Sequence, residues 1–268
     1  MRDYLGAIWN CRFFWLSLVK MDLTSRYRGS VLGICWSLLH PIAMTTILVL
    51  VFRYAFNMPD VRTFAPLIFT GFTFWGFFGA SLVQGCGCFF QGESYIRQFP
   101  APMAIYPLRN VLGAAFHFVI GLLLAIVFAL SVGPDAHDST RVSQLIALPS
   151  LLPTLMLLLL FGWSLSTLFG LLNVRFRDTR HLTEIALQGL FYLTPIMYSK
   201  TMFKNRMLGQ VLQYNPLVPF LDLLREPILY GRVPSLMTYA MAASVVLLVT
   251  VAAAIALKID ERRLIFHL

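Results

Sequence analysis

Several stretches of this sequence are long and apolar enough to cross a lipid bilayer, and they constrain the fold more than any other feature. A membrane-spanning helix needs roughly 20 mostly apolar residues. Charged residues make up only 12% of the 268 residues, and the mean hydropathy is +0.74. The alternating pattern of a transmembrane β-barrel is missing, which leaves helices as the spanning structure. The sequence therefore predicts an all-α integral membrane protein.

The apolar runs predict six transmembrane helices within a single transmembrane domain, residues 1–268. Residues 1–32 precede the bundle, residues 33–257 form it, and residues 258–268 form a tail. The six expected spans are residues 33–56, 65–90, 109–132, 142–172, 182–198 and 235–257.

Prolines are expected to distort the first and fourth of these spans, and the fifth contains one as well. Pro41 lies about two turns into the first span, Pro149 and Pro153 lie near the start of the fourth, and Pro195 lies in the short fifth. A proline inside a helix removes a backbone hydrogen bond and bends or breaks the helix.

Residues 3–26 predict an amphipathic helix that lies on the membrane surface. A soluble core helix is the weaker alternative, since nothing else in the chain forms a soluble domain. At the corner that follows, residues 25–41, Gly29 and Gly33 permit a sharp turn because they lack a Cβ atom. The apolar face of the helix is expected to carry Leu5, Ile8, Trp9, Phe13, Leu16, Val19 and Leu23.

Residues 200–232 predict a re-entrant helical hairpin between the fifth and sixth spans. Two apolar segments, residues 202–214 and 217–229, are separated by Asn215 and Pro216, and neither is long enough to cross a bilayer. Irregular backbone at membrane depth must be sheltered by protein.

Basic residues indicate the orientation. Most of the 21 Lys and Arg residues fall on the side that holds both termini, and the short loops of the other side hold only Arg53, Arg62 and Arg141. The positive-inside rule therefore predicts that both termini are cytoplasmic and that the hairpin is extracytoplasmic. The net charge of +9 is attributed to topology and anionic lipid rather than to nucleic acid, because the basic residues flank apolar runs.

Catalytic chemistry finds little support. His40, His117 and Glu184 are the candidates within the spans and stand alone in the sequence, and His117 fits an interhelical hydrogen bond better than a base. No Walker A motif is present, so we expect no ATP bound by this chain. No catalytic residue and no metal site are predicted. The cysteines Cys11, Cys35, Cys86 and Cys88 lack ligand partners and are expected to be small membrane hydrophobes.

Aromatic residues are abundant, with 23 Phe, 10 Tyr and 5 Trp. An interfacial belt or ordinary packing explains many of them. The functional alternative is a conduit whose wall stacks on the C–H faces of sugar rings, along which a polymer can slide. The candidates for such a path are Phe52, Phe56, Phe72, Trp75, Phe191, Tyr192 and Tyr198.

Residues 91–108 form a polar break with three prolines and are the best candidate for contact with a soluble partner. A short helix is expected from Glu93 to Phe99, stopped by Pro100 and Pro102. An ordinary loop is the alternative.

Four segments, in order and over nearly the whole chain, resemble the membrane subunit of ABC-type polysaccharide exporters, which move O-antigen, capsule or teichoic acid chains. The family's usual charged residue after Phe-Pro is replaced here by Ala101. The four segments are SRYRGSVLGICWSLLHP, SYIRQFPAPMAIYPLRN, NVRFRDTRHL followed by FYLTPIMYS, and YNPLVPFLDLLREPILYG.

The resemblance implies a non-enzymatic permease that forms a homodimeric channel above a separate dimer of ABC ATPase subunits, which bind ATP and Mg. It implies a coupling helix seated in that ATPase, made of Glu93, Ser94, Tyr95, Ile96, Arg97 and Gln98. It places Tyr27, Arg28, Gly29 and Gly33 at the cytoplasmic gate, where Arg28 meets a pyrophosphate headgroup or acts only in topology.

The implied function is export of a lipid-linked polysaccharide across the bacterial cytoplasmic (inner) membrane. The first candidate substrate is O-antigen on an undecaprenyl-type carrier, and capsule and teichoic acid polymers are the other candidates. The alternative is the permease of a related ABC drug or lipid exporter. A membrane-embedded transferase would need a catalytic cluster that the sequence does not show.

Overall fold

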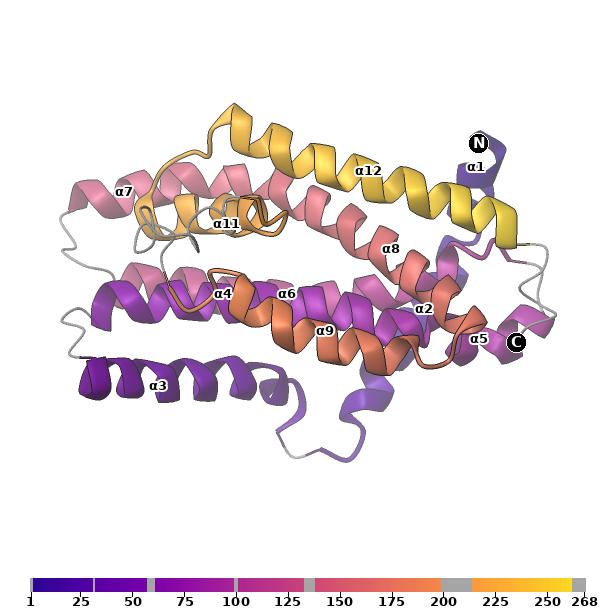
Figure 1. Ribbon diagram of the computed structural model, residues 1–268, viewed down its shortest axis with the longest axis horizontal. Coiled ribbons are helices and arrows are strands. Elements are labelled where there is room, and N and C mark those ends of the chain that lie inside the picture. Colours follow the sequence, from indigo (N-terminus) through magenta and orange to yellow (C-terminus); the bar gives the residue numbers. More distant parts are fainter. Residues whose placement is uncertain are drawn as a thin grey trace.

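The computed structural model describes residues 2–30, 32–56, 61–98, 101–132, 138–198 and 214–261. All regular elements in these ranges are helical, and most run side by side along one long axis (Figure 1). The elements are α1 (Arg2–Asn10), α2 (Arg12–Tyr27), α3 (Trp36–Phe56), α4 (Val61–Cys86), α5 (Cys88–Gln98), α6 (Ile105–Val132), α7 (Asp138–Ala147), α8 (Leu151–Arg175), α9 (Thr179–Leu193), α11 (Val218–Tyr230) and α12 (Leu236–Asp260).

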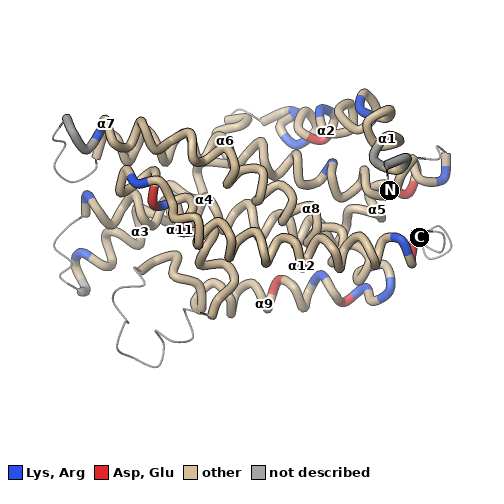
Figure 2. Tube along the Cα trace, turned by 90° about the horizontal axis from the view of Figure 1, so that it is seen from above, with Lys and Arg blue, Asp and Glu red and all other residues tan. Residues whose placement is uncertain are grey.

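Five helical segments are long and apolar enough to cross a membrane, which confirms an all-helical, multi-pass architecture. They are Gly33–Tyr54, Val61–Cys86, Ile105–Val132, Arg141–Arg175 and Leu236–Asp260. Charged residues of the described ranges gather at the two ends of the bundle and leave its middle nearly free of them (Figure 2). Such a distribution suits a protein whose middle lies in hydrocarbon.

The bundle is built around α4. It packs against α6, α8, α3, α9 and α11. Of the most apolar 18 residues of α4, 72% are buried, whereas the corresponding value is 11% for the segment that contains α3. Phenylalanines fill the centre, where the rings of Phe161 and Phe220 stack at 4.7 Å. Gly85 on α4 lets α8 approach closely, because an added Cβ would lie 2.7 Å from the backbone of Ser166.

The boundaries of two expected spans differ from the prediction. The second span, expected at residues 65–90, ends at Cys86, and a turn at Gly87 separates it from α5. The break expected over residues 91–108 is wrong in extent, because α5 begins at Cys88 and α6 already begins at Ile105. Apolar side chains explain the longer helix: Phe89 and Ile96 of α5 are buried in a cluster with Tyr106.

The fourth expected span, residues 142–172, is interrupted where the prolines predicted it. A single 3₁₀ turn, Leu148–Ser150, separates α7 from α8 and contains Pro149. Pro41, by contrast, lies inside the continuous helix α3. The last span begins with the hydroxyl of Ser235 capping the backbone N–H of Thr238 at 3.2 Å.

The fifth expected span corresponds to α9, which has 15 residues and is not one of the five candidate spans. Of the expected hairpin, α11 matches the second segment and is deeply buried. The first segment, residues 202–214, lies outside the described residues except for its last position.

A buried arginine holds α11 against the end of α9, and the sequence alone did not point to it. Arg225 is 6% exposed. It donates hydrogen bonds to the carbonyl oxygens of Pro195 at 2.7 Å, Ile196 at 2.8 Å and Leu67 at 3.3 Å. These carbonyls belong to the irregular backbone after α9 and to α4, so Arg225 satisfies polar groups that a proline-containing break exposes.

The N-terminal segment forms two helices, with a break at Cys11. Leu18 and Val19 of α2 are buried, so Val19 faces the protein. Trp9, Phe13 and Leu16 of the expected apolar face are exposed on the isolated chain.

Candidate functional site

The corner after α2 contains two glycines in the left-handed backbone conformation, Gly29 and Gly33, at the positions where the sequence predicted a turn. Gly29 has φ 79° and Gly33 has φ 50°, a region that side chains with a Cβ disfavour. The exposed Arg28 lies between α2 and this turn.

Tyr27 ties the corner to α6. Its hydroxyl lies 3.0 Å from Nδ1 of His117, which confirms the expected interhelical role of His117. The other two titratable candidates also have neighbours: Glu184 pairs with Arg180 at 3.2 Å, and the ring of His40 packs edge-on against Phe72 at 6.4 Å. Arg180 lies beside Glu184 because the two residues are one helical turn apart.

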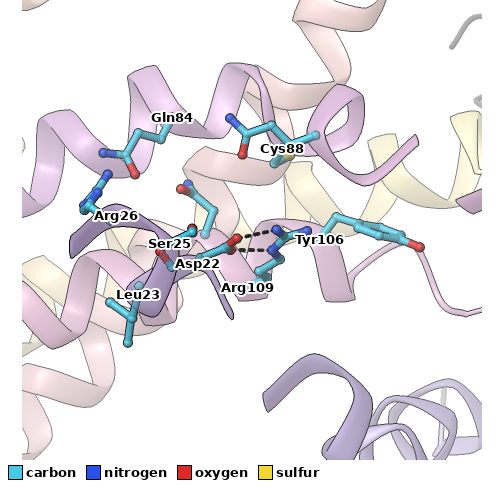
Figure 3. A pocket seen from close by; sticks show the side chains of 11 residues that line it. Asp22, Leu23, Ser25, Arg26, Gln84, Cys88, Tyr106 and Arg109 are labelled. Atoms are coloured by element: carbon cyan, nitrogen blue, oxygen red, sulfur yellow. Dashed lines mark hydrogen bonds and ion pairs between the residues drawn. The ribbon is translucent and has the colours of Figure 1, made fainter. Parts of the chain in front are cut away.

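A second tether between α2 and α6 is an ion pair that sequence reasoning missed. Nε and Nη2 of Arg109 bind the two carboxylate oxygens of Asp22 (Figure 3). The Arg109 side chain is 10% exposed and that of Asp22 is 40% exposed. The sequence does place an acidic residue within an amphipathic helix and a basic residue at the start of a span. Whether the two residues pair depends on how α2 crosses α6, which the sequence does not show.

Beside this ion pair lies a polar cavity of about 360 Å³. Figure 3 shows Arg26 and Gln84 facing one another across one side of it, with the Asp22–Arg109 pair on the other. The lining residues are Asp22, Leu23, Ser25, Arg26, Gln84, Cys88, Gln91, Tyr106, Arg109, Asn110 and Gly113.

Helix α5 contains all six predicted coupling residues and is clasped by the N-terminal helices. Tyr95 packs edge-on against Phe14 at 6.0 Å, and its hydroxyl donates to the sulfur of Met21 at 3.8 Å. Ile96 is buried. Glu93 and Arg97 form an ion pair at 2.9 Å, and Ser94, Arg97 and Gln98 are exposed. Polar side chains on this helix are thus available to a partner.

The segment after α5 is tied to both ends of the chain. Oε1 of Glu261, just after α12, accepts from the hydroxyl of Tyr4 at 2.8 Å and from the backbone N–H of Met103 at 3.3 Å. Trp163 of α8 donates to the carbonyl of Ala104 at 3.1 Å. Burial, followed by the bond to Glu261, raises the pKa of Tyr4, so its hydroxyl stays protonated and donates.

Four of the seven predicted path aromatics form one cluster on α4 and α9. Phe191 contacts Phe72 at 5.7 Å, Trp75 at 5.6 Å and Tyr192 at 5.4 Å between ring centroids. The Tyr198 hydroxyl donates to the carbonyl of Tyr192 at 2.9 Å.

Besides Tyr198, which contacts the cluster only through the backbone of Tyr192, two predicted path aromatics, Phe52 and Phe56, are not described as part of it. Phe52 pairs with Phe64 at 5.2 Å, and the side chain of Phe56 lies outside the described residues. The predicted cysteines are all free thiols, and Cys86 and Cys88 are buried.

Comparison with known proteins assigns this arrangement to a class. A family model described as ABC-2 type transporter matches residues 14–229. The chain is 25% identical to an O-antigen export system permease protein of Klebsiella pneumoniae, over 80% of this chain and 79% of that protein. It is 28% identical to one of Myxococcus xanthus, over 87% of each, and 22% identical to a polysialic acid transport protein of Escherichia coli, over 81% of each.

Proposed function

The chain belongs to the ABC-2 type transporter family, and from this premise we propose that it is the channel-forming subunit of an ATP-driven exporter of lipid-linked polysaccharide. The observation that carries the proposal is the similarity, over four fifths or more of the chain, to proteins named as export permeases for O-antigen. O-antigen on an undecaprenyl-type carrier is the proposed substrate. The similarity to a polysialic acid transport protein favours capsule export as the second candidate.

In this proposal, two copies of the chain form the channel and a dimer of separate ABC ATPase subunits binds ATP and Mg. The chain itself is a transporter subunit rather than an enzyme. Helix α5 seats in the ATPase through Glu93, Ser94, Tyr95, Ile96, Arg97 and Gln98. The exposure of Ser94, Arg97 and Gln98, and the packing of Tyr95 and Ile96 toward the protein, support this role.

The proposed topology has six spans, with α9 as the fifth. At 1.5 Å per residue its 15 residues cover about 22 Å, so it crosses only with help from the backbone that Arg225 holds. Helices α1 and α2 lie on the cytoplasmic surface of the inner membrane, both termini are cytoplasmic, and α11 is half of a re-entrant extracytoplasmic hairpin. The exposed Trp9, Phe13 and Leu16 support the surface position.

The polymer is proposed to enter at the gate formed by Tyr27, Arg28, Gly29 and Gly33. The path then follows the aromatic cluster on α4 and α9, where ring faces pack on sugar C–H groups. The exposed ring of Tyr192, at 68% exposure, is the member of the cluster most available to a passing polymer.

Polymer export in a strain that lacks this chain tests the proposal. Re-expression of the chain together with its ATPase is expected to restore polysaccharide at the cell surface, while either protein alone leaves lipid-linked polymer in the cytoplasm. Surface polymer that appears equally without this chain would contradict the proposal.

A further inference from the structure

Two neighbouring cavities lie between α4 and α6, on the side that α2 and α3 cover. The polar cavity described above is one of them. The second has a volume of about 210 Å³ and shares Arg26 with the first. The lining residues of α6 advance with helical spacing from Tyr106 to Gly121, a length of about 22 Å. Because the two cavities share Arg26 and follow one face of α6, we treat them as the two halves of one elongated site, the α4–α6 crevice.

The two halves of the crevice differ in polarity. The half near the ends of α4 and α6 exposes Ser25, Arg26, Gln84, Gln91 and Asn110. The inner half is lined mainly by apolar groups, among them Phe72, Phe77, Phe118 and Ala114. A lipid has the same arrangement, since its polar headgroup lies at the membrane surface and its apolar chain lies deeper in the bilayer.

The polar half carries one uncompensated positive charge. Asp22 is already paired with Arg109, and Arg26 makes no ion pair with any described residue. The side-chain amides of Gln84 and Gln91 also lack a hydrogen-bond partner within the described part of the chain. A guanidinium beside neutral donors suits an anionic phosphate oxygen, and basic pockets between spans bind phosphate headgroups.

Helix α2 crosses the crevice as a cover that is fixed at two points. The Asp22–Arg109 pair lies on one side of Arg26, and the Tyr27–His117 hydrogen bond lies on the other. Gly113 of α6 lines the same cavity as Arg26, and an added Cβ there would meet nothing within 4 Å. Gly76 leaves the same open space in the inner half. The crevice is thus a built space rather than a gap filled by side chains.

We propose that the α4–α6 crevice binds an amphiphile with a phosphate headgroup, held by Arg26, Gln84 and Gln91, whose apolar chain lies along Phe72, Phe77 and Phe118. Two sources share this chemistry: the isoprenyl carrier of the exported polymer and an anionic phospholipid of the surrounding membrane. The inference rests on the proposed function only where the carrier is the source.

Two variants of the full-length protein test the site. Arg26→Gln removes the charge, and Gly113→Leu projects a bulky side chain from a lining position where an added Cβ meets nothing within 4 Å, with a gain in helix propensity. Arg12→Gln, on the same helix, and Gly6→Leu, another glycine with open space, are the matched controls because neither residue lines the crevice. Thermal unfolding of each purified variant verifies its fold.

Binding of undecaprenyl phosphate and of phosphatidylglycerol is measured separately by native mass spectrometry. Arg26→Gln and Gly113→Leu are each expected to weaken binding about tenfold, the effect of losing one strong charge-assisted contact or the space for it, while both controls match the wild type. If only the binding of undecaprenyl phosphate is weakened, the carrier is the source of the phosphate headgroup. If the binding of phosphatidylglycerol is weakened as well, the site binds membrane phospholipid.

Wild-type affinity for both lipids in either crevice variant would overturn the inference. Polymer export is assayed in the same variants to separate the two proposals. Weakened lipid binding with normal export supports the site and places it off the transport path. Failure of the wild-type chain to support export removes the proposed function and leaves the binding result unaffected.

Discussion

At the scale of single residues, the chain depends on a few polar contacts whose partners are far apart in sequence. Asp22 and Arg109 join α2 to α6, and Arg225 caps the carbonyls after α9. Each satisfies a group whose isolation in an apolar environment is unfavourable. Residues that satisfy one another in this way are the most sensitive to substitution.

Asp22→Asn is expected to destabilise the protein because it leaves the Arg109 guanidinium, 10% exposed, without its counter-charge. The loss is about 1–2 kcal/mol, less than for a fully buried pair because Asp22 is partly exposed and screened by solvent. Thermal unfolding in detergent measures it. Glu93→Gln, which removes an exposed ion pair, is the control and should change stability by less than about 0.5 kcal/mol. Equal unfolding temperatures for the two variants would disprove the argument.

Gly92→Ala is expected to destabilise the packing of α5. The added Cβ would lie 2.4 Å from the ring of Tyr106, which is 1% exposed and has no room to move, and overpacking of this kind costs about 1–3 kcal/mol. Gly113→Ala is the matched control, since its Cβ meets nothing and helix propensity alone favours it by up to about 1 kcal/mol. The unfolding temperature should therefore fall for Gly92→Ala and rise for Gly113→Ala. A higher unfolding temperature for Gly92→Ala would refute the close contact.

At the scale of elements, α5 is a short helix held from three sides. Phe14 and Met21 of α2 contact Tyr95, Tyr106 of α6 lies against Gly92, and Glu261 holds the backbone after α5. A helix braced in this way moves together with its neighbours. If an ATPase pushes on α5, the force reaches α2 and the corner at Gly29 through these contacts.

The double substitution Tyr95→Ala/Arg97→Ala is expected to release the ATPase subunit. Arg97 presents charge on the exposed face of α5, and Tyr95 fixes the helix against α2. Co-purification of the ATPase with affinity-tagged permease, together with ATP turnover of the complex, measures the effect. Arg12→Gln, outside α5, provides the comparison. Unchanged assembly and unchanged turnover in the double variant would count against the coupling role of α5.

At the scale of the whole molecule, charges gather at the two ends and leave the middle nearly free of them in the described ranges (Figure 2). An aromatic cluster lies on α4 and α9, and both features suit the proposed conduit. The corner at Gly29 and Gly33 connects α2 to the first span. In the proposed function, a lipid-linked polymer that enters there passes the exposed Arg28 first.

Arg28→Ala is expected to lower polymer export severalfold at normal protein levels, because the exposed guanidinium that meets a pyrophosphate headgroup is lost. Surface polysaccharide, quantified against permease abundance in the membrane, measures the change. Arg28→Lys keeps the charge but loses bidentate geometry, so it should rescue export only in part. Normal export by Arg28→Ala would assign this residue to topology instead.

The sequence by itself determined the membrane class, the approximate positions of five of the six expected spans, the fourth-span break at Pro149 and the turn at Gly29 and Gly33. These follow from hydropathy and local backbone preference, which are properties of contiguous residues. The start of α5 at Cys88 was missed because its Phe-rich first turn reads as a continuation of α4. In the structure a turn at Gly87 separates the two helices, and Phe89 of α5 is buried in a cluster with Tyr106.

Only the tertiary structure decided which distant residues meet. The Asp22–Arg109 pair, the Tyr4–Glu261 contact, the Arg225 carbonyl cap and the crevice beside Arg26 all join segments separated by at least 29 residues. The physical reason is that helix periodicity determines which face of a segment is apolar, while the partner of each polar side chain depends on how the helices cross.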